Sequence, residues 1–261
     1  MDFSTMMTLE PHGPDTYVGI GPKYPWGGLY GGQIVAQALR AAAATVEPQF
    51  RVHSLHAYFI RRGDHEEPIR FEVDRIRNGR SFVTRSVIAR QSIGAILNMS
   101  ASFQVDERAA DMQTAEAPVA PRPDELQGTA WMQMFERRFA GGDSGRAIAW
   151  LRMLDKVGDD PVLNACALAY VSDDLPTDAV VKLLYPERKP GEWDVEFPFW
   201  TASLDHAIWF HRPIRADDWH LQEFSCHGLI SSRGLSVGHV FDLEGVHLAT
   251  ISQEVLLRDL R

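Results

Sequence analysis

The chain has 261 residues, a formal net charge of −9 and 45% hydrophobic residues. This length suits one large domain or two small ones, and the apolar fraction is sufficient for a sizeable core. The negative charge excludes a basic field over the whole molecule, so general nucleic-acid binding is not expected. No apolar run approaches the roughly 18 residues that a membrane span needs, so no membrane span is expected.

The two cysteines and the first residues of the chain indicate a cellular compartment. Cys166 and Cys226 are too few for a disulfide framework, and we expect them to be unlinked. Residues 1–20 lack a basic start followed by an apolar stretch, which a secretory signal would have. The sequence therefore predicts a cytoplasmic protein.

The first hundred residues predict one helix followed by four antiparallel strands. Residues 29–47 are rich in alanine, contain no proline and begin near Gly31 and Gly32, which indicates a buried helix. After it, apolar and polar residues alternate, and Asn78-Gly79 is typical of a hairpin turn. The predicted strands cover residues 52–60, 69–74, 81–91 and 95–105.

The next forty or so residues have a different composition. Residues 106–145 contain three prolines, many charges and the pair Gly141-Gly142, which favours a linker. Within it we predict a short helix around residues 131–139.

The helix-then-strands pattern returns in the second half. Pro161 begins a stretch that predicts a helix over residues 161–171, and residues 186–198 have the composition of a loop. Glu244-Gly245 is expected to form the last hairpin turn. The predicted strands cover residues 200–210, 219–230, 235–243 and 246–256.

The two halves resemble each other. Residues 54–59 match residues 204–210, and residues 100–104, which end in Gln104, match residues 249–253, which end in Gln253. A repeat of about 100 residues indicates a duplicated domain. One helix wrapped by a curved antiparallel sheet is the hotdog arrangement, so we predict an α+β double hotdog whose two sheets pair edge to edge. The predicted division is 1–105 for the N-terminal hotdog, 106–145 for the linker and 146–261 for the C-terminal hotdog.

Many spaced blocks in this order make the chain similar to the acyl-CoA thioesterase II (TesB-like) family. The blocks are residues 30–33, 53–59, 78–82 and 101–104 in the first half, and residues 204–206, 209–213, 232–234 and 253–254 in the second. The resemblance implies two fused hotdog domains that hydrolyse acyl-CoA to a free acid and CoA without a cofactor. It is weakest over residues 106–160 and 174–198.

The resemblance also implies a catalytic trio of an aspartate, a hydroxyl residue and a glutamine. The aspartate ends a helix in the run Tyr170-Val171-Ser172-Asp173, the hydroxyl is Ser203, two residues before Asp205-His206, and the glutamine is Gln253 in the last strand. Asp174 follows Asp173 directly, so the helix register could put either carboxylate in the site; the pattern favours Asp173.

These residue types suffice for thioester hydrolysis. A carboxylate can take a proton from water, while a hydroxyl and an amide hold that water in place. For Asp173 the alternative is a helix-end cap or a solvated residue, and for Ser203 an ordinary strand serine. Gly31 and Gly32 suit an oxyanion-binding role at a helix start, or a tight turn into close helix packing.

Other functions remain open at this stage. A non-catalytic acyl-CoA binding protein would keep the fold, as would a hotdog enoyl-CoA hydratase or dehydratase, although we find no Asp and His set for the latter. The expected partner is acyl-CoA, no metal site is expected, and a homo-oligomer is left open. Five arginines suit the CoA phosphates or a solvated strand face: Arg61, Arg62, Arg77, Arg80 and Arg85.

Overall fold

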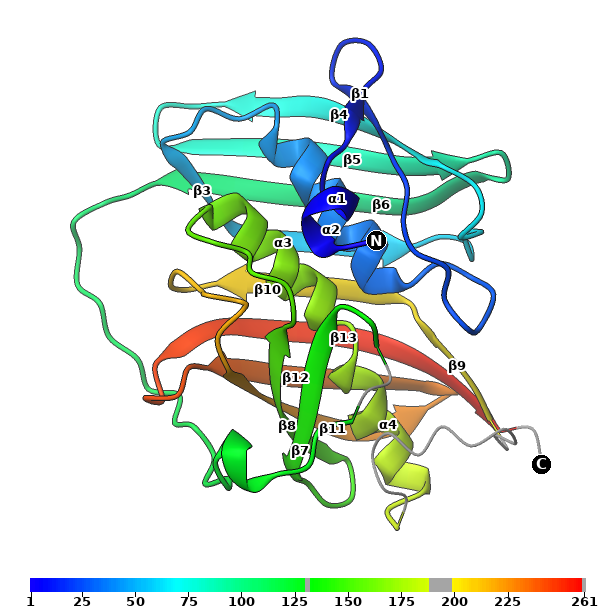
Figure 1. Cartoon of the computed structure of the whole chain (residues 1–261), viewed down its shortest axis with the longest axis vertical. Coiled ribbons are helices and arrows are strands. Elements are labelled where there is room, and N and C mark those ends of the chain that lie inside the picture. The colour runs from blue at the N-terminus through cyan, green and yellow to red at the C-terminus, as the bar shows by residue number, and fades with distance from the viewer. Residues whose placement is uncertain (130–131, 188–198, 260–261) are drawn as a thin grey trace.

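The computed structural model describes residues 1–129, 132–187 and 199–259 and contains one 13-stranded antiparallel sheet (Figure 1). Along the sheet the strand order is β1-β2-β4-β5-β6-β3-β10-β13-β12-β11-β8-β7, and β9 pairs with β13. The first half supplies β1 (Glu10–Pro11), β2 (Thr16–Gly19), β3 (Phe50–Phe59), β4 (Ile69–Asn78), β5 (Phe82–Gln91) and β6 (Gly94–Val105). The second half supplies β7 (Phe135–Gly141), β8 (Arg146–Met153), β9 (Phe199–Ser203), β10 (Asp205–Phe210), β11 (His220–Ile230), β12 (Arg233–Phe241) and β13 (His247–Asp259).

The two halves join where β3 pairs with β10. Leu55 lies opposite Ile208, and both side chains are fully buried. Because side chains alternate between the two faces of a strand, this register turns His206 and Ile208 toward the same buried face as Leu55 and Ala57. The predicted double hotdog with sheets paired edge to edge is confirmed.

Three longer helices lie on one face of this sheet, as Figure 1 shows. They are α2 (Gly31–Ala43), α3 (Pro161–Val171) and α4 (Leu175–Leu184); α1 (Phe3–Met6) and the 3-10 helix η1 (Pro123–Glu125) are short. Helix α2 packs on strands of the first half and on α3, while α4 packs on β8, β11, β12 and β13. The pair α2–α3 therefore brings together the helices of the two halves.

Capping and proline residues explain where helix α3 begins and where the next helix starts. The Asp160 side chain accepts hydrogen bonds from the N–H groups of Val162 and Leu163, and Pro161 occupies the first helical position. Pro176 occupies an early position of α4, where its missing N–H is tolerated. Residues 172–174 thus form a short break between the two helices.

The predicted helices at 29–47 and 161–171 are confirmed as α2 and α3. The predicted strands are present with shifted ends, except that residues 200–210 form two strands, β9 and β10. The short helix predicted around residues 131–139 is wrong, because residues 135–139 belong to strand β7; residues 130–131 lie outside the described part. Arg137 occupies a buried position of this strand, where the alternating pattern of a strand would have an apolar residue. The sequence pattern therefore did not indicate a strand. The helix α4 and the strand β8 were also missed.

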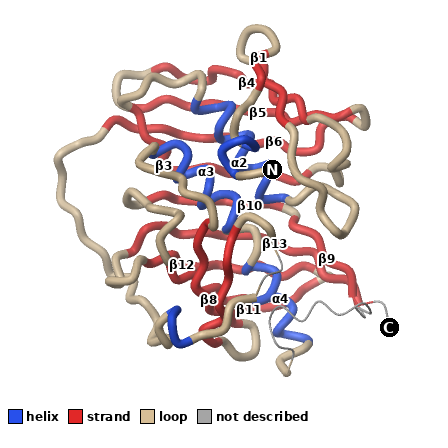
Figure 2. Tube along the Cα trace, in the orientation of Figure 1, coloured by secondary structure: helices blue, strands red, loops and turns tan. Residues whose placement is uncertain are grey.

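The loop after β6 runs down the side of the sheet to the second half (Figure 2). It is held to the second half by hydrogen bonds from Gln113 to the Gly245 carbonyl and from Arg122 to the Leu243 carbonyl. Trp150 also donates to the Pro121 carbonyl, at 2.8 Å. The predicted boundaries of the two domains and the linker remain a prediction, but the predicted linker includes β7, which pairs with β8.

A buried ion pair ties β7 to the helix break. Arg137 donates to Asp174 and Asp178, and the side chains of Arg137, Asp174 and Asp178 are 0%, 0% and 9% exposed. Burial lowers the pKa of Arg137, but the two carboxylates more than offset this, and the net shift is upward. A buried charge is tolerated only when it is paired.

Replacing Arg137 with alanine should therefore destabilise the fold strongly. Two buried carboxylates would lose the guanidinium they share, and the free energy of unfolding should fall by about 3–5 kcal/mol. The matched control is Arg75→Ala, which breaks the exposed pair with Asp15 and should cost less than about 1 kcal/mol. Urea denaturation measures both; similar small losses in the two variants would contradict the assigned role of Arg137.

No helix in the described ranges has both the length and the apolar character needed to cross a membrane.

Candidate active site

Asp173 lies in the break between α3 and α4, with its side chain buried against the first half of the chain. Its Oδ2 accepts a hydrogen bond from the backbone N–H of Gly32, at 2.9 Å. Its Oδ1 accepts one from the Ser203 hydroxyl, at 2.8 Å. The neighbouring Asp174 instead bonds to Arg137. The break therefore turns the two adjacent carboxylates toward different partners.

Ser203 and Gln253 meet across paired strands of the second half. Ser203 ends β9 and lies opposite Val255 of β13, two residues from Gln253 and on the same face. The Gln253 Nε2 donates to the Ser203 Oγ at 2.8 Å. The structure thus brings together all three members of the trio that the sequence resemblance implied, with Gly32 of the other half.

Burial dominates the electrostatics of Asp173. It raises the pKa of the carboxyl from 3.8 to about 7, because the charged form is poorly solvated there. Hydrogen bonds from Ser203, Gly32 and Gln253 favour the charged form and lower the pKa, while the nearby negative charge of Asp174 raises it. A carboxyl with a pKa near neutrality can both accept and release a proton at physiological pH.

The two glycines allow α2 and the end of α3 to approach closely. A Cβ on Gly32 would lie 2.2 Å from the Tyr170 carbonyl oxygen, and one on Gly31 would lie 2.6 Å from the Asp173 Oδ2. Close packing, one of the two roles considered from the sequence, is therefore present. The Gly32 N–H is bonded to Asp173. The oxyanion role of Gly31 and Gly32 stays a prediction.

His206 is a site residue that sequence reasoning missed. It lies on β10, is 0% exposed, and its Nδ1 is 2.5 Å from the Gln253 Oε1. Burial lowers its pKa to about 4, which keeps the ring neutral. Its place in the alternating pattern of β10, on the buried face with Ile208, was the signal that could have indicated it.

The arginines considered for the CoA phosphates divide into two kinds. Arg85 is buried and structural, because its guanidinium donates to the side chains of Thr45 and Asn78 and to three backbone carbonyls. Arg61 and Arg62 are exposed and donate to the Ala95 and Trp26 carbonyls. Arg62 therefore lies against the loop that leads into α2.

Metal and thiol chemistry have little structural basis in the described residues. No three His, Cys, Asp or Glu side chains among them are arranged to hold a metal ion. Cys166 and Cys226 are both buried and unlinked, and burial raises the pKa of Cys166 to about 12.

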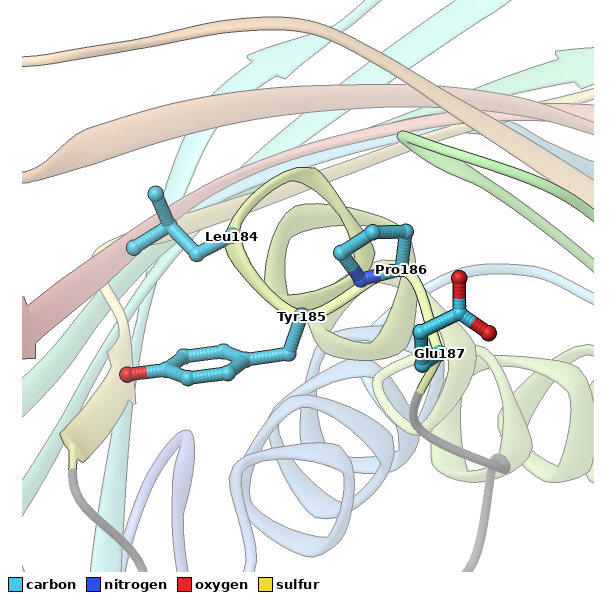
Figure 3. Close-up of a pocket in the computed structure, with 4 residues that line it drawn as sticks. All are labelled: Leu184, Tyr185, Pro186 and Glu187. Carbon is cyan, nitrogen blue, oxygen red and sulfur yellow. The ribbon is translucent and has the colours of Figure 1, made fainter.

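A pocket of about 420 Å³ lies at the end of α4 (Figure 3). Its lining residues are Leu184, Tyr185, Pro186 and Glu187, and none of the trio lines it. The candidate site is therefore defined by the hydrogen-bonded cluster at Asp173 and not by this pocket.

Two family models match successive parts of the chain. Residues 21–104 match the family model of the acyl-CoA thioesterase N-terminal domain, and residues 112–257 match that of the C-terminal domain. The chain belongs to the TesB-like acyl-CoA thioesterase II family. Members of this family are thioester hydrolases.

Individual thioesterases agree with this assignment. Human acyl-coenzyme A thioesterase 8 is 32% identical, over 98% of this chain and 88% of its own length. Acyl-CoA thioesterase 2 of Haemophilus influenzae is 32% identical, over 88% of this chain and 87% of its own length. The crystal structure of the acyl-CoA thioesterase II TesB2 from Mycobacterium marinum is 35% identical with a TM-score of 0.86, over 98% of both chains.

In this thioesterase the approach of α2 to the end of α3 can be tested with Gly32→Ala. The new Cβ would meet a backbone oxygen that cannot rotate away, so α2 must shift, at a cost of about 1–3 kcal/mol in the free energy of unfolding. We also expect kcat to fall, because the Gly32 N–H moves away from Asp173. A Cβ at Gly228 meets nothing within 4 Å, so Gly228→Ala is the control. Equal behaviour of the two variants in denaturation and turnover would refute the close-packing argument.

Proposed function

We propose that this protein hydrolyses acyl-CoA thioesters with a water molecule that Asp173 activates. The observation that carries the proposal is the buried carboxylate, whose pKa lies near 7 and whose two oxygens are held by Ser203 and Gly32. Membership of the acyl-CoA thioesterase family supports the substrate class.

In the proposed reaction no covalent enzyme intermediate forms. Asp173 takes one proton from water as the water oxygen attacks the thioester carbonyl carbon. The carbonyl oxygen becomes an oxyanion near the start of α2, where the helix dipole and the Gly31 N–H favour negative charge. The carbon–sulfur bond then breaks, and the proton held by Asp173 passes to the leaving sulfur, which yields the free acid and CoA.

Ser203 and Gln253 contribute orientation in this proposal. Ser203 bonds to both Asp173 and Gln253, so hydrogen bonds join the three side chains. Holding the reacting water in line with the carbonyl removes an entropic cost that a free water would meet.

The non-catalytic binding alternative is disfavoured because the whole trio is present and hydrogen-bonded. For the hydratase alternative we find no observation that favours it. A cytoplasmic location remains a prediction, and an acyl-CoA substrate would place the protein in lipid metabolism.

Variants at the two adjacent aspartates separate the proposed base from its neighbour. Asp173→Asn should lower kcat by about 10² to 10⁴, because it removes the base. Asp174→Asn should lower stability through its bond to Arg137 but leave kcat of the folded enzyme near that of the wild type. Ser203→Ala and Gln253→Ala should each cost less than Asp173→Asn, and their effects should not add fully.

The measurement is release of free thiol from acyl-CoAs of acetyl to palmitoyl chain length, with circular dichroism to confirm folding. An active Asp173→Asn variant together with an inactive Asp174→Asn variant would show that Asp174 is the base. Absence of thiol release by the wild type over the whole series would refute the proposed reaction.

The activity should also depend on pH in a defined direction. The base must be deprotonated, so kcat/KM should fall as the pH drops through about 7. The Ser203 hydrogen bond lowers the pKa of Asp173, so in Ser203→Ala the fall in kcat/KM should occur at a higher pH. A pH profile that is flat between pH 6 and 8, or a shift to lower pH in Ser203→Ala, would contradict this assignment.

A further inference from the structure

A chain of hydrogen bonds continues from the proposed trio through a buried histidine and back to the end of α3. The His206 Nδ1 bonds to the Gln253 Oε1, and the His206 Nε2 is 2.9 Å from the Ser172 Oγ. Ser172 caps the end of α3 and directly precedes Asp173 in the chain. This series of hydrogen bonds thus starts at Ser172 and ends at Asp173, which are neighbouring residues at the end of α3.

The donors and acceptors of this chain have only one consistent direction when Asp173 is charged. A carboxylate only accepts hydrogen bonds, so the Ser203 hydroxyl must donate its single hydrogen bond to Asp173. It must therefore accept the hydrogen bond from Gln253. The Gln253 Nε2 therefore faces Ser203, and its Oε1, which only accepts, faces His206.

The same accounting determines which ring nitrogen of His206 carries the proton. Nδ1 must donate to the Gln253 Oε1, so in a neutral ring Nε2 must accept. Its donor is the Ser172 hydroxyl at 2.9 Å, which is closer to Nε2 than to its other acceptor, the Ala169 carbonyl, at 3.4 Å. The ring is fully buried, and burial lowers its pKa to about 4, so the neutral form is expected. Removal of the Nδ1 proton would leave two acceptors facing each other.

We propose that His206 is a positioning residue that fixes the amide orientation of Gln253, and that Ser172 selects the tautomer of His206 that can do so. This inference rests on the proposed function, in which Gln253 and Ser203 orient the water at Asp173. A buried amide without this donor can rotate by half a turn and present its oxygen to Ser203. The loss of orientation then reaches the reacting water although His206 does not touch it.

The tautomer is tested first, on the wild-type protein and without substrate. Nitrogen-15 NMR of histidine-labelled protein at about pH 8, above the Asp173 pKa of about 7, distinguishes protonated from unprotonated ring nitrogens. The His206 signal is assigned by its absence in His206→Asn. We expect a proton on Nδ1 and none on Nε2; a proton on Nε2, or on both nitrogens, would overturn the proposal.

Three variants then test the consequence for catalysis. His206→Leu removes the donor and should lower kcat by about 10- to 100-fold with little change in KM, because the reacting water is then misplaced. His206→Asn should recover most of that loss, because its amide nitrogen is as many bonds from Cα as Nδ1 is and can donate to Gln253. Ser172→Ala should lower kcat by less than His206→Leu, and it provides the test if the leucine variant does not fold.

His220→Leu is the matched control, because His220 is also a fully buried neutral histidine, but it bonds to the Asp218 carbonyl and to Gln222. Full kcat in both folded His206→Leu and Ser172→Ala, or equal losses in the leucine and asparagine variants at 206, would overturn the proposal. If the wild type releases no thiol, the proposed function fails, while the NMR experiment still tests the direction of the hydrogen-bond chain.

Discussion

The pairing of β3 with β10 is the constraint on which the rest of the structure depends. It joins the two curved sheets at fully buried positions such as Leu55 and Ile208, so the register cannot slip by one residue without exposing them. With this register, helices α2 and α3 of the two halves meet on one face of the sheet. The end of one helix then faces the start of the other, and the candidate active site forms between them.

The start of α2 can approach the end of α3 because Gly32 is a glycine, and this approach buries the carboxylate of Asp173. Because Gly32 has no Cβ, its backbone approaches Tyr170 closely, and its N–H reaches the Asp173 Oδ2. Burying a carboxylate without a cation is unfavourable, which appears here as a pKa near 7. Asp174, one residue further, is held instead by Arg137. Two adjacent residues of the same type thus have different roles because the helix break turns them to different surroundings.

A hydrogen-bonded cluster connects Ser172 to Asp173 through His206, Gln253 and Ser203. In the proposed direction Ser172 donates to His206, His206 to Gln253 and Gln253 to Ser203, and the last acceptor is the Asp173 carboxylate. A fully paired polar network in a buried place holds its members in one arrangement, since any rotation would leave a buried group unpaired. Such preorganisation is what the proposed activated water would require.

Much of this protein was determined by local sequence alone. The alanine-rich run that became α2, the proline that begins α3, and the alternating strands were predictable because they depend on neighbours along the chain. The duplicated pattern predicted the double hotdog, and the family resemblance implied Asp173, Ser203 and Gln253. Strand β7 was not predictable, because its buried Arg137 is stable only through carboxylates about 40 residues away. The pattern favoured Asp173 over Asp174, but only the tertiary structure shows which of them contacts Ser203 and that His206 contacts Gln253. Both contacts join segments that are far apart in the sequence.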